Sequence, residues 1–194
     1  MSSQEVHLHF KGPFKFTPGP TCIFTSALAN VPCVYLWTFR SKIDGRFYIH
    51  YVGEALRLGP RHKQHLSAIL GLSYAIFDTE SAKNGTQTRI WPGLWREKGT
   101  DGPLKQLATY ETIGPKVLEY VREIDIFIAE THVGTQLRKH LEGSVGWNLR
   151  NNHKDLKALY PDDNHVGTMA NRPGIILRIT SDENIAGLDA ELKI

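Results

Sequence analysis

Two runs of β-branched and aromatic residues, separated by a short polar segment, constrain the fold of this chain most strongly. The first run is 33–40 (CVYLWTFR) and the second is 47–52 (FYIHYV), with the pair Asp44-Gly45 between them. Such residues favour extended strands, and Asp-Gly is a strong signal for the tight turn of a hairpin. The sequence therefore predicts a β-hairpin over 33–52.

The segment 60–72 (PRHKQHLSAILGL) follows the hairpin and has the pattern of a helix. Pro60 suits a first helical position, where its missing N–H costs nothing. Arg61 and His65 are four residues apart and therefore share one side of the predicted helix. A neighbouring apolar stripe is formed by Leu66, Ile69 and Leu70.

Two further strands and one further helix are indicated downstream. Isoleucines at every second position predict a strand over 123–130 (EIDIFIAE), and 174–180 (GIILRIT) predicts another. Thr135 is a suitable cap for a helix whose apolar residues recur every four positions. Glu142 lies beside this stripe, which consists of Leu137, Leu141 and Val145.

The order of these elements predicts an α/β fold of the α+β type, with a small mixed or antiparallel three-stranded sheet flanked by helices. A chain of 194 residues is long enough for about one domain. We place that domain at 32–158, with a Gly- and Pro-rich insertion at about 78–118. Residues 1–31 are expected to form an N-terminal extension with a short strand pair at 5–16. Residues 159–194 are expected to form a C-terminal strand and an acidic tail.

Composition excludes several classes of protein. Hydrophobic residues make up 41% of the chain and charged residues 22%, which does not fit a collagen-like or fully disordered chain. Cys22 and Cys33 form no CxxC, which excludes a disulfide scaffold or zinc knuckle and suits a reducing cytoplasm. The uncharged run 16–39 is interrupted by three prolines and a glycine, and the first residues lack the pattern of an export signal. We expect a cytoplasmic protein without membrane contact.

Five ordered motifs resemble those of the GIY-YIG nuclease family, whose catalytic module occurs in excision-repair, homing and some restriction endonucleases. The matching stretch runs from about residue 32 to residue 153. The motifs are Cys33-Val34-Tyr35, Tyr51-Val52-Gly53, Arg61 with His65, Glu142 and Asn152. Cys33 stands where the family has a glycine, and the last motif lacks a proline, so Asn148, Asn151 and Asn152 are alternatives for one role. Five pieces in order, each on its predicted element, are more specific than any one of them.

The resemblance implies a metal-dependent endonuclease that hydrolyses phosphodiester bonds in DNA. Glu142 would bind one Mg²⁺ or Mn²⁺ ion, because Mg²⁺ is usually held by one or two carboxylates together with waters and substrate phosphates. The planar guanidinium of Arg61 suits a phosphate. Tyr35 or Tyr51 would orient the attacking water or accept its proton, and His65 would share that role or hold a tyrosine hydroxyl. The division of labour between the two tyrosines is left open.

Basic residues are concentrated around the predicted site. Segment 40–65 contains six basic and two acidic residues and segment 138–157 five basic and two acidic ones, whereas 182–194 has a net charge of −3. A surface that follows nucleic-acid phosphates requires clustered positive charge. DNA is the expected partner and RNA the alternative. The candidate phosphate contacts are Arg40, Lys42, Arg57, Lys63, Arg138, Arg150 and Lys154.

Two other interpretations fit the same sequence. One is a catalytically silent nucleic-acid-binding module on the same fold, suggested by the cysteine in place of a glycine. The other is a different nuclease site formed by Asp182 and the segment 191–193 (ELK), in a place where chain ends usually fray. Taken one at a time, the tyrosines suit strand packing, and the arginine, histidine and glutamate suit a solvated surface. The nuclease prediction therefore depends on their combination; substrate preference and oligomeric state are left open.

Overall fold

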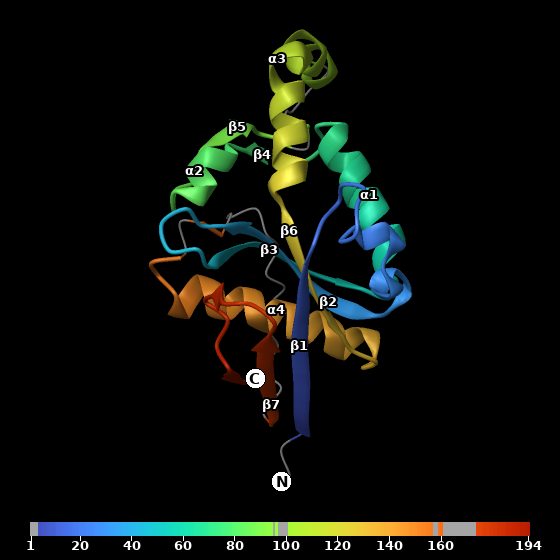
Figure 1. Ribbon diagram of the computed structural model, residues 1–194, viewed down its shortest axis with the longest axis vertical. Helices are drawn as coiled ribbons and strands as arrows, with labels where there is room; N and C mark the ends of the chain where they lie inside the picture. Colours follow the sequence, from blue (N-terminus) through green and yellow to red (C-terminus); the bar gives the residue numbers. More distant parts are fainter. Residues whose placement is uncertain (1–3, 95, 97–100, 157–158, 161–173) are drawn as a thin grey trace.

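The computed structural model describes residues 4–94, 96, 101–156, 159–160 and 174–194. These residues form a mixed α+β fold in which helices cover a large sheet (Figure 1). The α/β class predicted from the sequence is confirmed. The prediction of a small three-stranded sheet is wrong, because the sheet has seven strands. Within the described ranges, no helix combines the length and the apolar character needed to cross a membrane.

The strands of the large sheet are β1 (Gln4–Phe14), β2 (Cys33–Arg40), β3 (Phe47–Ala55), β6 (Asp125–Glu130), β7 (Ile175–Ser181), β8 (Ile185–Ala186) and β9 (Glu191–Lys193). They lie in the order β8-β3-β2-β6-β1-β7-β9. The predicted hairpin is confirmed, since β2 and β3 pair antiparallel, and β2 also pairs antiparallel with β6. The three expected strands thus form one part of the sheet, and β1 with the C-terminal strands extends it beyond β6.

The first strand corrects the prediction of a short strand pair at 5–16. β1 is one strand of eleven residues that lies between β6 and β7. Alternate residues, Val6, Leu8 and Phe10, are buried in the core. The Gly12-Pro13 pair continues the strand, with a register shift between Lys11 and Phe14 where β1 pairs with β6. This segment is therefore an integral part of the sheet.

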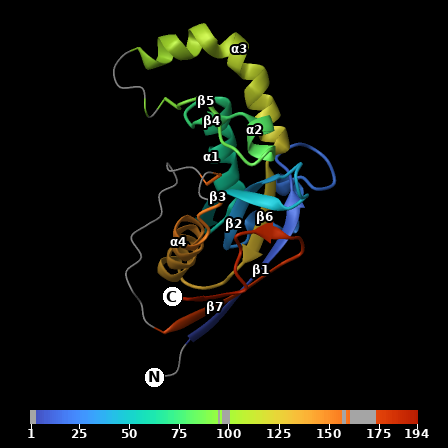
Figure 2. The ribbon, with the colours of Figure 1, turned by 90° about the vertical axis from the view of Figure 1, so that its left-hand side faces the viewer.

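The long helices are α1 (Leu58–Leu70), α3 (Gly102–Glu123) and α4 (Thr135–Asn152). Helices α1 and α3 contribute to the core on one face of the sheet, and α4 contributes to the core on the other face (Figures 1 and 2). Successive side chains of a strand point to opposite faces. Tyr35 and Trp37 of β2 therefore belong to the core under α1 and α3, and Leu36 belongs to the core under α4.

The predicted insertion at 78–118, together with the two residues before it, contains ordered elements. A small sheet and a short helix are formed by β4 (Ile76–Phe77), β5 (Arg89–Trp91) and α2 (Thr79–Lys83). The first half of α3 projects beyond the rest of the molecule (Figures 1 and 2), and Leu104 and Leu107 on it are exposed. Two short 3-10 turns, Ile23–Thr25 and Ala27–Asn30, precede β2. The insertion therefore adds a layer on the α1 side and does not join the large sheet.

Candidate active site

The Tyr35 side chain lies at the centre of the candidate site. Pairing of β2 with β3 places Tyr35 opposite Gly53. A Cβ added to Gly53 would overlap the Tyr35 ring and hydroxyl and would come within 2.7 Å of Tyr51 Cε1. The glycine of the second motif is therefore required for the two tyrosine rings to lie beside one another, with centroids 6.0 Å apart.

Cys33, which replaces the first glycine of the motif, is accommodated in a regular strand. It pairs with Ala55 of β3 on one side and with Glu130 of β6 on the other. The side chain is fully buried, and burial raises the pKa of the thiol to about 12. Cys33 is thus a neutral packing residue in the same regular strand that carries Tyr35.

Two histidines on the buried face of α1 pack against the tyrosine. His62 and His65 are three residues apart and therefore lie on the same side of the helix. Trp37 Nε1 donates to His62 Nε2 at 3.3 Å, so His62 Nδ1 carries the ring proton and donates to the Leu58 carbonyl oxygen at 3.2 Å. Burial lowers the pKa of His62 to about 4. This ring is neutral, and both of its nitrogens are used in packing.

His65 joins two tyrosine hydroxyls. Its Nε2 lies 2.7 Å from the Tyr35 hydroxyl, and its Nδ1 lies 3.2 Å from the Tyr74 hydroxyl. Burial lowers the pKa of His65 to about 3, and the positive charge of Arg61 contributes to the same shift. Of the two roles expected for His65, this geometry corresponds to the second, which is to hold a tyrosine hydroxyl.

The two tyrosine hydroxyls of the motifs lie in different environments. Tyr35 is fully buried, and burial raises its pKa well above the ordinary value, with Tyr51 adding to the rise and Arg61 opposing it. Tyr51 is half-buried, and burial also raises its pKa, with the negative charge of Glu142 adding to the rise. The positive charge of Arg61 lowers the pKa of Tyr51. Tyr51 is therefore the hydroxyl nearer to solvent, and Tyr35 lies behind it.

Arg61 lies on the exposed side of α1 and acts on both tyrosines. The positive charge of its guanidinium lowers the pKa of both hydroxyls and so favours their ionised forms. Arg61 Nη1 also donates to Gln64 Oε1 at 3.4 Å. A guanidinium has five N–H donors. Several of them therefore remain available to a phosphate.

Glu142 belongs to α4, which covers the sheet face opposite to α1. The two faces meet around the outer edge of β3, and Figure 2 shows β3 between α1 and α4. β8 pairs with Phe47 and Tyr48 of this strand. Among the described residues, no strand covers the outer edge of β3 at 51–55. Side chains from the two helices can therefore interact around this open edge.

The Glu142 carboxylate is half-buried and interacts electrostatically with Arg61. Burial raises the pKa of Glu142 to about 7, the Glu54 carboxylate adds to the rise, and Arg61 and Lys139 oppose it. Within the described ranges, Glu142 makes no hydrogen bond or ion pair, and no group of three or more metal-ligating side chains is present. A single free carboxylate beside a second one suits Mg²⁺, whose other ligands are commonly waters and phosphate oxygens.

A buried ion pair beside Glu142 was not predicted from the sequence. Arg138 Nε of α4 donates to Glu54 Oε2 of β3 at 2.6 Å, and the Arg138 side chain is 2% exposed. Arg138 therefore does not lie on the surface as a phosphate contact, contrary to the prediction, because its guanidinium faces Glu54. The sequence positions of the two residues could have indicated the pair. Glu54 directly follows Gly53 of the second motif, and Arg138 precedes Glu142 by one helical turn.

The predicted closing asparagine donates its hydrogen bond to a residue outside the other four motifs. Asn152 lies ten residues beyond Glu142, which is about 15 Å along the helix axis. Its Nδ2 donates to Asn148 Oδ1 at 2.6 Å, and Asn148 Nδ2 donates to Asp189 Oδ2 at 2.8 Å. Asn151 donates to a carbonyl of its own helix. These amides connect the end of α4 to the C-terminal segment.

The start of α4 also differs from the prediction. Gly134 occupies the cap position, and Thr135 is the first helical residue. The Thr135 hydroxyl oxygen accepts a hydrogen bond from Arg138 Nη2 at 3.3 Å. Thr135 therefore supports the buried ion pair and does not cap the helix.

Two of the basic candidates lie near Arg61 on the chain. Arg57 directly precedes α1, one helical turn before Arg61, and both are exposed. Lys63 is also exposed, but a residue two positions further along a helix points to a different side. Arg57 is therefore the better placed of the two to contact a polyanion bound at Arg61.

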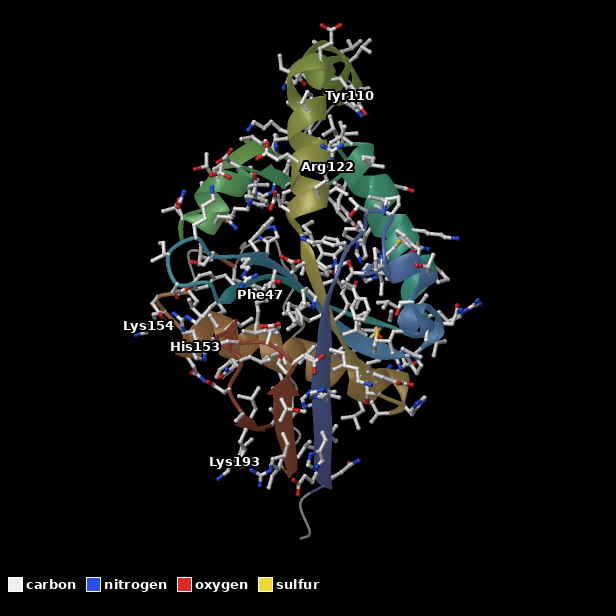
Figure 3. All side chains as sticks on the ribbon, viewed as in Figure 1. Phe47, Tyr110, Arg122, His153, Lys154 and Lys193 are labelled. Atoms are coloured by element: carbon white, nitrogen blue, oxygen red, sulfur yellow. The ribbon has the colours of Figure 1, made fainter. Side chains whose placement is uncertain are left out.

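The other basic candidates lie away from the tyrosines. Arg40 is five residues beyond Tyr35 in β2, about 17 Å along the strand, and Lys42 in the adjoining turn pairs with Glu80 at 2.5 Å. Arg150 lies in the last turns of α4, and the exposed Lys154 follows the helix (Figure 3). Basic residues that are close together in the sequence are thus spread over several parts of the surface.

The residues of the alternative C-terminal site are also separated. Asp182 pairs with His9, whereas Glu191 pairs with Arg178 and lies opposite it in the sheet. Four residues of chain separate Arg178 from Asp182, which corresponds to about 13 Å. The structure therefore does not bring these carboxylates into one site.

Comparisons with protein-family models, curated proteins and solved structures found no match to this chain. A function must therefore be argued from the geometry of the site itself.

Proposed function

We propose that this chain is a metal-dependent endonuclease that hydrolyses phosphodiester bonds in DNA. The observation that carries the proposal is that one guanidinium, Arg61, acts both on two tyrosine hydroxyls and on a carboxylate from the opposite face of the sheet. The ordered motifs that resemble the GIY-YIG nucleases support the same assignment. The proposed site consists of Tyr35, Tyr51, Arg61, His65 and Glu142.

Each of these side chains has a role that phosphodiester hydrolysis requires. Arg61 binds the phosphate oxygens and neutralises the charge that develops on them. Tyr51, the more exposed hydroxyl, orients the attacking water and accepts its proton. The positive charge of Arg61 favours the ionised form of Tyr51. His65 holds the Tyr35 hydroxyl in place.

Glu142 is the residue that would hold a Mg²⁺ or Mn²⁺ ion. Its carboxylate is half-buried, makes no ion pair among the described residues and lies near Glu54, which is itself paired with Arg138. Such an ion supplies positive charge that acidifies a bound water and stabilises the phosphate in the transition state. Glu142 must lose its proton to act as a ligand. With a pKa of about 7, this residue binds protons and metal in competition near neutral pH.

Nicking of supercoiled plasmid DNA in Mg²⁺ or Mn²⁺ tests the proposal. Arg61→Ala and Glu142→Gln should each reduce the cleavage rate by at least about a hundredfold, since each removes a group that stabilises the transition state. Matched controls are Arg122→Ala (Figure 3) and Glu111→Gln, which change exposed residues of α3 and should leave the rate unaltered. Cleavage by Arg61→Ala at the parent rate would contradict the assignment.

The same experiment separates the alternative function. A silent nucleic-acid-binding module would bind DNA with an affinity that falls steeply as salt increases, but it would not cut DNA in either metal. Parallel assays with RNA decide which nucleic acid is the substrate.

A further inference from the structure

A third tyrosine hydroxyl adjoins the site through His65. Tyr74 lies between α1 and β4, and its hydroxyl is 3.2 Å from His65 Nδ1. On the other side of the same ring, Nε2 is 2.7 Å from the Tyr35 hydroxyl. Tyr35 and His65 are buried, whereas Tyr74 is half-buried. These three side chains form a hydrogen-bonded chain from a buried hydroxyl of the site to the hydroxyl of a half-buried tyrosine.

One tautomer of His65 lets every hydrogen bond in this chain donate in the same direction. The low pKa of His65 keeps its ring neutral, so one nitrogen donates and the other accepts. Tyr35 has one hydroxyl proton and can donate it to a single acceptor, and His65 Nε2 lies 2.7 Å from its oxygen. With His65 Nε2 as that acceptor, Nδ1 carries the ring proton and donates to Tyr74. Every donor then points from the site toward solvent.

We propose, on the basis of the endonuclease function, that Tyr74 is the outlet of a proton relay from the site. It releases to solvent a proton in exchange for the one that Tyr35 transfers to His65. Tyr74 contacts His65 and acts through it, so it is a positioning residue for the reaction and does not touch the substrate.

The transfer balances in protons and bonds. The attacking water gives a proton to the Tyr51 oxygen, Tyr51 gives its own to Tyr35, and Tyr35 gives its own to His65 Nε2. His65 then gives the Nδ1 proton to Tyr74, and Tyr74 releases its proton to bulk water. Five O–H or N–H bonds break and five form, and the products are a hydroxide at the phosphate and a hydronium ion in solvent. The reverse sequence protonates the leaving oxyanion and restores the first tautomer of His65.

The environment of His65 explains why this relay needs a partner at Nδ1. A charged imidazolium beside Arg61 and away from water is unfavourable, so the ring cannot store the proton that it receives. Uptake at Nε2 must therefore be coupled to release from Nδ1. Tyr74 is the residue whose hydroxyl lies at that nitrogen.

The state of His65 can be measured without any cleavage assay. In ¹⁵N spectra of the full chain with labelled histidine, between pH 6 and 8, His65 should be neutral with its proton on Nδ1. The spectrum of His65→Gln identifies its signals. Tyr74→Phe should shift them, whereas Tyr110→Phe, at an exposed tyrosine on α3 (Figure 3), should not. A proton on Nε2 in the parent protein would overturn the relay.

Cleavage kinetics test the relay in turnover. Tyr74→Phe keeps the ring and removes the hydroxyl, so it should lower kcat roughly tenfold or more while KM for DNA stays unchanged. The dependence of kcat on the deuterium content of the solvent should be curved for the parent, because several protons move together, and closer to linear for Tyr74→Phe. Tyr110→Phe should behave like the parent in both measurements.

The outcomes separate this proposal from the endonuclease proposal on which it rests. Parent-like kcat in Tyr74→Phe, with cleavage intact, overturns the relay and leaves the endonuclease assignment standing. Absence of cleavage by the parent in Mg²⁺ and Mn²⁺ overturns the endonuclease assignment, and the relay as a part of turnover with it. In that case the position of the His65 proton still decides whether the hydrogen-bonded chain runs in the direction inferred here.

Discussion

The described part of the molecule contains two buried hydrogen bonds between a tyrosine and a histidine, and one of them lies at the candidate site. The Tyr35 hydroxyl lies 2.7 Å from His65 Nε2, and the Tyr120 hydroxyl lies 2.7 Å from His50 Nε2. Burial lowers the pKa of both histidines to about 3 and raises the pKa of both tyrosines. As isolated pairs, the two are chemically alike.

Their surroundings differ. His50 packs against the rings of Phe39 and Phe77, at centroid distances of 5.1 and 5.0 Å, beside a small cavity lined by uncharged side chains. The pair at the candidate site instead adjoins Arg61 and, through it, the Glu142 carboxylate. The comparison teaches that the neighbouring charges, and not the buried hydrogen bond, decide whether such a pair can take part in chemistry.

The largest difference between the pairs is expected in activity. Tyr35→Phe should reduce plasmid cleavage by about a hundredfold or more, because it removes a hydroxyl that supports proton transfer. Tyr120→Phe should leave the rate within about twofold of the parent. Both substitutions leave a buried histidine nitrogen without its partner and should lower the free energy of unfolding by about 1–3 kcal/mol. Equal losses of activity, measured by initial nicking rates, would remove the distinction between the two pairs.

The charged groups on the β3 side of the candidate site include the buried ion pair between Arg138 and Glu54, which a substitution of Arg138 would break. Arg138→Met leaves Glu54 buried and unpaired, and should lower the free energy of unfolding by about 3–5 kcal/mol in urea titrations. Adding Glu54→Gln should recover part of that loss. The control is Arg178→Met, which removes exposed ion pairs and should cost less than about 1 kcal/mol. A loss at Arg138 as small as the loss at Arg178 would show that the buried pair does not stabilise the edge.

Tyr35 of the first pair packs directly against Gly53, and replacing this glycine should lower stability by less than the loss of Arg138 does. Gly53→Ala forces a methyl group into the Tyr35 ring and should cost about 1–3 kcal/mol of stability as well as most of the cleavage activity. Gly134→Ala is the matched control, since a Cβ there meets no atom within 4 Å. It should change stability by about 0.5 kcal/mol, as expected at a helix cap. Thermal unfolding and nicking rates of the two variants measure the difference.

The smallest difference between the two pairs is expected in how the free energy of unfolding depends on pH, where both histidines should behave alike. The folded-state pKa of each histidine, about 3, lies below the ordinary value of 6.5. The stability that each contributes is therefore fully present above pH 6.5 and is lost as pH falls toward 3. Each should contribute about 1.4 kcal/mol per pH unit to the slope of unfolding free energy in that window. His50→Gln and His65→Gln should reduce the slope equally; unequal reductions would show that one ring is protonated in the folded protein.

Local sequence patterns were sufficient for much of the fold. The hairpin of β2 and β3, helix α1, strand β6 and helix α4 all lie within a few residues of their predicted positions. Their signals are short-range, because period-two or helical spacing of apolar residues reports which face of an element is buried. The cap of α4 was assigned to Thr135, but the structure has Gly134 at that position. Threonine and glycine are both acceptable capping residues, so the sequence alone did not distinguish between them.

The size of the sheet could not be read from local patterns. β1 pairs with β7 between residues about 170 positions apart, and nothing in either segment specifies the other. The Gly12-Pro13 pair is typical of a turn, and the contacts of β1 with β6 and β7 override that preference. Pairing partners of strands depend on the whole chain, which explains why three strands were expected where seven form.

The candidate site was predictable where its members have fixed spacing. The order of the tyrosines, Arg61 and His65 follows from a hairpin that leads into a helix, so these residues are close for local reasons. The interaction of Glu142 with Arg61 depends on the open edge of β3, which a linear sequence does not reveal. Tyr74 was missed because a tyrosine in a loop has no periodic signal. Asn152 was assigned to the site by the resemblance to the family motif, whereas its side chain donates to Asn148 on the same helix.

The position of β1 also bears on how the chain reaches this fold. The antiparallel unit of β2, β3 and β6 closes over shorter loops, whereas β1 needs β7, about 170 residues later, to fill its other side. Loop closure over that length is slow, so we expect β6 and β1 to expose unpaired backbone while the C-terminal strands are still being recruited. Partly folded molecules at that stage present strand edges to one another and are the species most prone to aggregate.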